Sequence, residues 1–119
     1  MEFFRRLDTP LPPSGLQAAL TIAALPTLCA SIGQVLQNSG EEGEIYSLWG
    51  QFKVRREEIN GGVRFTLPTC PNALAWTVTT APAQLTIHTT INRTEHDPDF
   101  IESIELFMDD WVEGLSQLR

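Results

Sequence analysis

Residues 51–68, QFKVRREEINGGVRFTLP, form the segment that most restricts what this chain can fold into. Apolar and polar side chains alternate on both sides of Asn60-Gly61. This dipeptide favours a two-residue turn of type I′, because both residues tolerate positive φ. The sequence therefore predicts a β-hairpin in which Glu57 lies opposite Arg64. A three-residue loop would mix the two faces, so the two-residue register is preferred.

In this register one face of the hairpin is apolar and the other is basic. Lys53, Arg55 and Arg64 share the polar face, while Arg56 and Glu58 fall on the apolar side near the turn. The tip must therefore extend beyond the core or be covered by another surface. A basic face on a rigid element predicts a partner-binding surface made of Lys53, Arg55, Arg56 and Arg64. The alternative is ordinary cross-strand pairing of acidic with basic residues.

The β pattern continues on both sides of the hairpin. From residue 44 onward, the periodicity is two, and Tyr46, Leu48, Phe52 and Val54 share parity across Gly50. This pattern predicts either one long strand bent at the glycine or two strands joined by a tight turn at Trp49-Gly50. Alternation also marks residues 74–79 and 85–91. We expect an antiparallel meander of four or five strands with one apolar face.

The N-terminal third is predicted to be mostly helical. Residues 1–8 are interpreted as a short strand or a docked arm, and the three prolines of residues 9–15 argue against a regular element there. An alanine-rich stretch at residues 16–25 and a second segment at 27–37, separated by Pro26, predict a bent pair of helices.

Asp97-Pro98 predicts the start of a long C-terminal helix, with an acidic cap followed by proline in the first turn. Eight apolar residues then recur at helical spacing: Phe100, Ile101, Ile104, Phe107, Met108, Trp111, Val112 and Leu115. A sheet with one apolar face needs a cover, and this amphipathic helix supplies it. The predicted fold is a single α+β domain over residues 1–119: an N-terminal helical pair, the meander, and the C-terminal helix packed on the sheet.

This order of elements resembles, in topology, the helix-grip folds of START and Bet v 1-like proteins, in which a curved sheet wraps a C-terminal helix around a ligand cavity. The resemblance implies a cavity between sheet and helix, lined here by Phe65, Trp76, Phe107 and Trp111. The chain would then be a small-molecule binding protein. Such aromatic residues more often form a plain hydrophobic core.

The formal net charge of −7 restricts the partners of this chain. Nucleic acids and anionic membranes attract clustered Lys and Arg, so we expect neither, and another protein is the expected partner. Homo-oligomerisation is left open. Two cysteines, Cys29 and Cys70, give no disulfide framework, which indicates a cytoplasmic location. The apolar run 16–32 resembles part of a signal peptide, but Glu2 and Asp8 dilute its positive flank, and a soluble core helix is preferred.

Acidic residues on the C-terminal helix form a second candidate partner-binding surface. Glu102, Glu105, Asp109 and Glu113 recur at helical spacing, and residues 95–117 contain no Lys or Arg. Like charges one turn apart destabilise a helix, so selection for stability alone would interleave lysines. This acidic stripe predicts docking of a basic partner. The alternative is a solvated face that keeps the protein soluble.

Two acidic loops are a candidate calcium site. Hard cations take several oxygen ligands, which these loops would supply if they converged. Neither loop has EF-hand spacing, and the second is also explained by helix capping. The candidate metal ligands are Glu41, Glu42, Glu44, Asp97 and Asp99.

The chain contains no established catalytic motif. His88 and His96 are the two histidines that could activate Cys70, and the sequence gives no geometry that would join them. We therefore expect neither an enzyme nor a cofactor. The expected function is that of a small acidic, non-enzymatic interaction protein, an adaptor or chaperone-like factor. The alternatives are a small-molecule binding protein and a calcium-binding protein.

Overall fold

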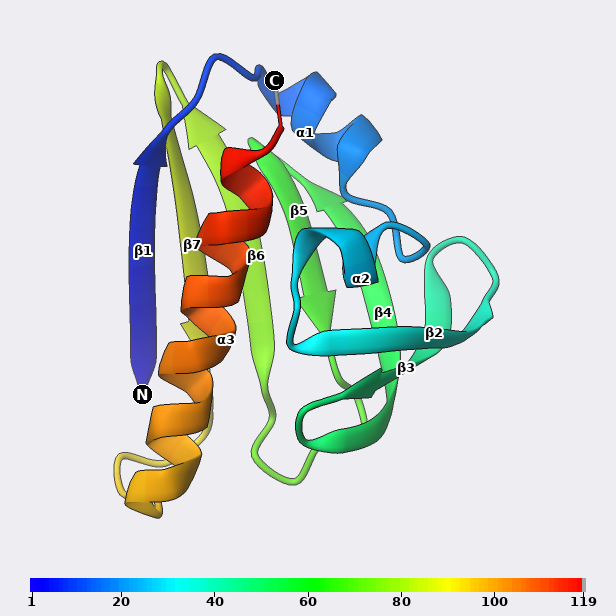
Figure 1. Cartoon of the computed structure of the whole chain (residues 1–119), viewed down its shortest axis with the longest axis vertical. Coiled ribbons are helices and arrows are strands. Elements are labelled where there is room, and N and C mark those ends of the chain that lie inside the picture. The colour runs from blue at the N-terminus through cyan, green and yellow to red at the C-terminus, as the bar shows by residue number, and fades with distance from the viewer. Residues whose placement is uncertain (119) are drawn as a thin grey trace.

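A computed structural model of the chain describes residues 1–118 (Figure 1). Seven strands form one antiparallel sheet in the order β1-β7-β6-β5-β4-β3-β2. The strands are β1 (Glu2–Asp8), β2 (Ile32–Asn38), β3 (Glu42–Ser47), β4 (Gly50–Ile59), β5 (Gly62–Thr66), β6 (Ala75–Ala81) and β7 (Gln84–Thr90). The helices are α1 (Pro13–Ala19), α2 (Leu25–Leu28) and α3 (Pro98–Ser116).

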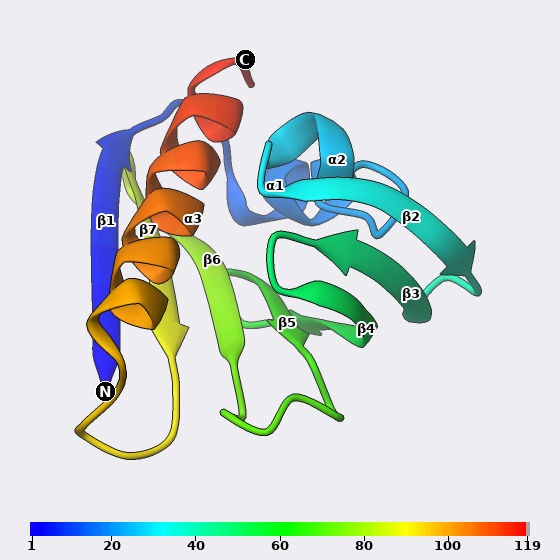
Figure 2. The ribbon, with the colours of Figure 1, turned by 60° about the horizontal axis from the view of Figure 1, so that its bottom comes forward.

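The sheet is strongly curved, and α3 crosses its concave face (Figures 1 and 2). α3 contacts β1 and β7, while α1 packs against β5 and β6, and α2 packs against β2 and α3. Five residues of α3 are buried in this interface: Ile104, Phe107, Met108, Trp111 and Leu115. Asp97 caps the helix by accepting a 2.8 Å hydrogen bond from the Asp99 N–H. The prediction of an α+β fold with a C-terminal helix on an antiparallel sheet is confirmed.

The hairpin of β4 and β5 has the predicted two-residue register. Glu57 lies opposite Arg64, and Ile59 lies opposite Gly62 across the turn. The predicted turn type is wrong, because only Gly61 has a positive φ, of 90°. The Gly61 carbonyl oxygen accepts a 2.9 Å hydrogen bond from the Thr80 N–H of β6, which ties the turn to the next strand.

The sheet has more strands than the four or five predicted. Of the segment predicted as a strand or a docked arm, Glu2–Asp8 form β1, which pairs with β7 along its whole length. Of the two alternatives at Gly50, the split into two strands is the one observed. The chain turns at Leu48-Trp49, Gly50 adopts a φ of 107°, and Ile45 of β3 lies opposite Phe52 of β4.

The predicted second helix at residues 27–37 is wrong. α2 is a single turn, and most of this segment forms β2. Cys29 already has extended dihedral angles (φ −146°, ψ 113°), and Ile32 lies opposite Ser47 of β3. Short apolar stretches fit helical and extended spacing alike, and a hydrogen-bonded neighbouring strand decides between them.

α1 begins earlier than predicted. The prolines of residues 9–15 do not prevent a helix, because Pro12 is the N-cap residue and Pro13 lies in the first turn, where backbone N–H groups have no intrahelical partner. The helix ends at Ala19, well before the predicted end.

Gly114 permits the close approach of α3 to α2. A Cβ atom at this position would lie 1.7 Å from the carbonyl oxygen of Leu28 and 2.4 Å from its carbonyl carbon. Both are backbone atoms, so no change of side-chain rotamer removes the clash. Any other residue at position 114 would force α2 and α3 apart.

We expect Gly114→Ala to destabilise the protein by ~1–3 kcal/mol, because the added methyl group overpacks this contact. Helix propensity alone would favour alanine by about 1 kcal/mol, so the sign of the change is informative. Urea denaturation measures it. Gly33→Ala is the control, since a Cβ there would meet only the Tyr46 carbonyl oxygen, at 3.8 Å. A stabilised Gly114→Ala protein would contradict the close approach.

Candidate functional site

The four aromatic residues predicted to line a ligand cavity lie together between the sheet and α3. Phe65, Trp76, Phe107 and Trp111 are each at most 1 % exposed. The ring centroid of Trp76 is 5.3 Å from that of Phe65, 5.0 Å from Phe107 and 6.2 Å from Trp111. Rings at such distances are in contact. We call these four residues the aromatic cluster; binding of a ligand among them stays a prediction.

Trp49 closes one end of the aromatic cluster. It lies in the turn between β3 and β4, and its Nε1–H donates a 2.8 Å hydrogen bond to Ser103 Oγ of α3. Its ring centroid is 5.0 Å from Phe107 and 6.3 Å from Phe100. The turn is therefore fastened to α3. Sequence reasoning missed this contact, because a tryptophan beside a glycine indicates a turn but not its neighbour.

Two polar groups of the aromatic cluster have no hydrogen-bond partner within residues 1–118. They are the indole Nε1–H groups of Trp76 and Trp111. An unpaired buried donor costs ~1–3 kcal/mol relative to a paired one. A small molecule or a water molecule that offers an acceptor would satisfy them. This feature is visible only in the structure.

Arg56 does not belong to the exposed basic face, because it is only 6 % exposed. Its Nε donates a 2.6 Å hydrogen bond to the Leu20 carbonyl oxygen, and its Nη2 donates one of 2.7 Å to the Gln17 carbonyl oxygen. Its Nη1 lies 2.8 Å from Glu41 Oε1. The sequence predicts that the hairpin tip either extends beyond the core or is covered by another surface. The structure shows the covered arrangement, in which the C-terminal end of α1 lies over the tip.

The other basic residues of the hairpin are exposed on the outer face. These are Lys53, Arg55 and Arg64. Arg55 Nε lies 3.5 Å from Glu42 Oε1, and Lys53 lies opposite Glu44 in the β3–β4 ladder. Acidic residues therefore alternate with basic ones here. This face is not uniformly positive.

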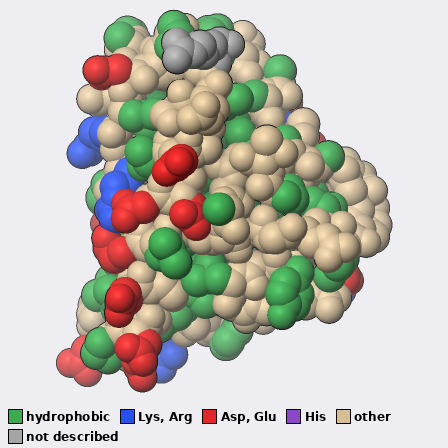
Figure 3. Space-filling model, viewed as in Figure 1, with side chains coloured by type: hydrophobic (Ala, Val, Ile, Leu, Met, Phe, Trp, Pro, Cys, Tyr) green, Lys and Arg blue, Asp and Glu red, His purple; other side chains and the backbone are tan. Residues whose placement is uncertain are grey.

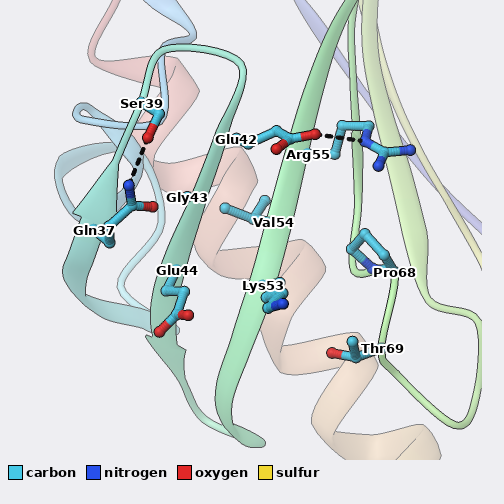
Figure 4. A pocket seen from close by; sticks show the side chains of 10 residues that line it. All are labelled: Gln37, Ser39, Glu42, Gly43, Glu44, Lys53, Val54, Arg55, Pro68 and Thr69. Atoms are coloured by element: carbon cyan, nitrogen blue, oxygen red, sulfur yellow. Dashed lines mark hydrogen bonds and ion pairs between the residues drawn. The ribbon is translucent and has the colours of Figure 1, made fainter.

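A pocket of about 400 Å³ lies beside these residues (Figure 4). Its walls come from β2, β3, β4 and the loop after β5, which contributes Pro68 and Thr69. In the close-up, the Glu42 and Arg55 side chains meet across the strands, at one side of the pocket. Its lining holds two acidic residues, Glu42 and Glu44, and two basic ones, Lys53 and Arg55, so the pocket favours neither an anion nor a cation.

The acidic stripe of α3 is partly neutralised by Arg5 of β1. The Arg5 guanidinium pairs with Glu105, and its Nε lies 3.1 Å from Asp109 Oδ1. The hydrogen bond to Glu105 raises the pKa of Arg5. Glu102 and Glu113 are exposed and have no ion-pair partner among the residues that the structure describes. The predicted stripe is thus split into paired and free carboxylates.

The two acidic loops do not converge on a cation site in the described part of the chain. No group of three or more His, Cys, Asp or Glu side chains there is arranged to hold a metal ion. The candidate ligands have other roles: Glu41 pairs with Arg56, Glu42 pairs with Arg55, Glu44 accepts a hydrogen bond from Gln51, Asp97 caps α3, and Asp99 lies in its first turn. The calcium hypothesis therefore has no clustered ligand set here.

The histidine and cysteine candidates have structural contacts of their own. His88 Nε2 lies 2.9 Å from Glu2 Oε1, and the His88 ring stacks on Phe4 at 4.3 Å. Cys29 is buried, and desolvation raises the pKa of its thiol to about 12. Cys70 is half-buried in the loop after β5.

Sequence reasoning missed a group of exposed apolar residues between β3 and α3. Tyr46, Leu48 and Leu106 are 56 %, 40 % and 54 % exposed. They line a shallow depression of about 330 Å³ together with Gly33 and Asp110, and we call the three the apolar patch. The space-filling view shows hydrophobic side chains on this face next to acidic side chains along α3 (Figure 3).

The parity of the sequence predicts that Tyr46 and Leu48 are buried, which explains why the apolar patch was missed. Tyr46 and Leu48 share parity with Phe52, and a continuous strand would bury all three. The turn at residues 48–49 reverses that parity, so Ile45 is buried and Tyr46 is exposed. Leu106 gives the one available signal, because it lies among the acidic residues of α3 rather than on its apolar side.

Comparisons with known proteins do not identify a family. No protein-family model matches the chain, and no curated protein matches it significantly. No helix within residues 1–118 is long and apolar enough to cross a membrane. The functional argument therefore depends on the surfaces described above.

We expect Arg56→Ala to destabilise the protein by ~2–4 kcal/mol, because it leaves the Leu20 and Gln17 carbonyl oxygens without a donor. The neighbouring Arg55→Ala is the control and should cost less than about 1 kcal/mol, since its ion pair is exposed. Urea denaturation measures both. Arg56→Lys should not restore stability, because one ammonium group cannot replace the guanidinium fork. Equal effects at the two positions would contradict the role of Arg56.

We expect a thiol reagent at mildly alkaline pH to modify Cys70 alone in the folded protein and both cysteines in urea. The pKa of the Cys29 thiol is about 12 in the folded protein, whereas it is about 8.5 in the unfolded chain. Stability should therefore fall as pH rises through this range. Thiol counting checks the first expectation, and a Cys29→Val variant should lose the Cys29 part of the pH dependence. Rapid modification of folded Cys70→Ser would contradict the burial of Cys29.

Proposed function

We propose that this chain is a small non-enzymatic interaction protein, an adaptor or chaperone-like factor, which binds another protein through the face between α3 and strands β2 and β3. The apolar patch is the observation that carries this proposal. Exposed apolar side chains that gather in one place are typical of interaction sites. In this chain they lie between β3 and α3, whereas the apolar residues of the concave face are buried under α3.

The charge around the apolar patch supports a basic partner. Asp110 lines the same depression, and Glu102 and Glu113, which have no ion-pair partner within residues 1–118, are exposed on α3. α3 contains no Lys or Arg in its 19 residues. A one-signed rim around an apolar centre steers an oppositely charged partner and disfavours others. The basic face of the hairpin is a weaker second surface, because acidic residues alternate with its basic ones.

A cytoplasmic location fits this proposal. Neither Cys29 nor Cys70 forms a disulfide bond, and both are free thiols. Free thiols are typical of a reducing compartment.

Binding of a small molecule is the second candidate function. The curved sheet around α3, preceded by two helices after the first strand, is similar in topology to the helix-grip folds. The unpaired Nε1–H groups of Trp76 and Trp111 are the observation that favours it. The contacts within the aromatic cluster oppose it, because a ligand would have to separate rings that now touch. Trp49 would have to leave Ser103 as well.

One experiment with two arms separates these functions. The full chain is mixed with the protein fraction of source cells and, separately, with their small-molecule fraction. Native mass spectrometry detects complexes, and thermal unfolding detects ligands that bind the folded state. We expect a protein complex of defined stoichiometry and no rise in melting temperature with the small-molecule fraction.

Two variants complete this experiment. Leu106→Asn tests the apolar patch and should lose the protein complex while keeping its melting temperature. Phe4→Asn changes an exposed aromatic residue on the opposite edge of the sheet and should keep the complex. A small molecule that copurifies and raises the melting temperature, with no protein complex, would overturn the proposal in favour of the second candidate.

A further inference from the structure

We propose that the free edge of β2 accepts an extended segment of the partner protein as an additional strand, and that this segment alternates apolar with basic side chains. This inference depends on the proposed function and specifies how the partner binds. It follows from the backbone of β2, the charges of the two sheet edges, the apolar patch, and the acidic side chains of α3.

β2 is one end of the sheet, and between Gly33 and Asn38 its backbone bonds to β3 alone among the residues described. The groups on its other side therefore have no backbone partner. The side chains of this segment are exposed, except for that of Val35, which is half-buried. β2 thus extends beyond the core, and its outer edge is open to another chain.

The two edges of the sheet differ in charge. β1 carries Glu2, Arg5, Arg6 and Asp8, and Arg5 is held by α3. β2 (Ile32–Asn38) carries no charged residue. Charged side chains on an edge strand oppose pairing with another strand, and their absence permits it. The edge formed by β2 is therefore the one suited to strand addition.

The shape of β2 favours a flexible segment over a second copy of this chain. Its pairing with β3 shifts register twice, between Ile32 and Gln34 and between Val35 and Gln37. Such bulges increase the twist of an edge strand. A single extended segment can follow a twisted edge, whereas two folded sheets would have to match it rigidly. Each copy also carries a net charge of −7, which opposes self-association.

The apolar patch and α3 supply side-chain specificity. Gly33 of β2 lines the same depression as Leu48 and Leu106, so a strand added to β2 would place a side chain at this depression. Asp110 lies beside it, bonded to Ser31 Oγ at 2.5 Å. An apolar side chain fits the depression. Basic side chains would lie toward the free carboxylates of α3.

The test uses a displayed library of random peptides, selected on the immobilised full chain. We expect the enriched peptides to alternate apolar residues with Lys or Arg. One enriched peptide is then synthesised and titrated into isotope-labelled protein. Amide signals of residues 33–38 should shift and their hydrogen exchange should slow, as should happen when an edge becomes an interior strand.

Three variants locate the site. Gly33→Pro removes an N–H that lies in a bulge and has no partner residue in β3, and it should weaken peptide binding by about tenfold or more. Leu106→Asn tests the same site without changing β2, so a folding defect in the proline variant leaves the inference testable. Phe4→Asn on β1 is the control and should bind as well as the unmodified chain. Circular dichroism confirms folding of each variant.

Three results would overturn the inference. The first is peptide binding that shifts only the hairpin face or α3 and leaves β2 unchanged. The second is a selection that enriches no peptide. The third is a concentration-dependent dimer in sedimentation that Gly33→Pro abolishes, since the edge would then serve a second copy. None of the three removes the proposed function, which fails only if the native mass spectrometry experiment finds no protein complex.

Discussion

Burial of the concave face of the sheet under a single helix is the interaction on which the other elements depend. A seven-stranded antiparallel sheet exposes one apolar face, and among the helices that the structure describes α3 is the one long enough to cross it. The sheet curves around α3, and the aromatic cluster occupies the space where Trp76 of β6 meets Phe107 and Trp111. Aromatic side chains suit this place, because each buries a large area with few rotatable bonds.

Polar contacts then fix the remaining parts to this core. Arg56 reaches the backbone of α1 from inside the sheet, and Arg5 joins β1 to the acidic side of α3. Trp49 joins the β3–β4 turn to Ser103. Within residues 1–118, no β2 side chain makes a polar contact of this kind with another helix or strand, since those of Gln37 and Asn38 bond only to the adjoining turn. The strand that we assign to partner binding is therefore held by its backbone pairing with β3 and its packing on α2.

Local sequence signals predict the elements whose own residues determine their structure. Asn60-Gly61 gives the hairpin register and Asp97-Pro98 gives the start of α3, because turn and cap chemistry is contained in a few neighbouring residues. The helix prediction for residues 27–37 is wrong because the structure of this segment depends on pairing with β3, which no local signal encodes. The exposure of Tyr46 likewise depends on where the chain reverses at Trp49-Gly50, and local signals do not decide between a turn and a bend there.

The candidate site follows the same division. The acidic residues of α3 could be read from their helical spacing, but the ion pairs that Arg5 makes with two of them could not, since Arg5 is distant in sequence. Arg56 shows the reverse case. Its parity indicates an unusual position, but the carbonyl groups that surround it belong to α1, which the sequence places wrongly.

The pairing of β1 with β7 also constrains the order in which the molecule can form. The first strand of the chain lies beside the last one, and α3, which covers both, follows β7 in the sequence. During synthesis, β1 cannot pair until residues 84–90 have been made. Contacts between residues so far apart in sequence slow folding and prolong the exposure of unpaired strands. The four charged residues of β1 therefore have a second role. They oppose aggregation of this strand during the time before β7 is available to pair with it.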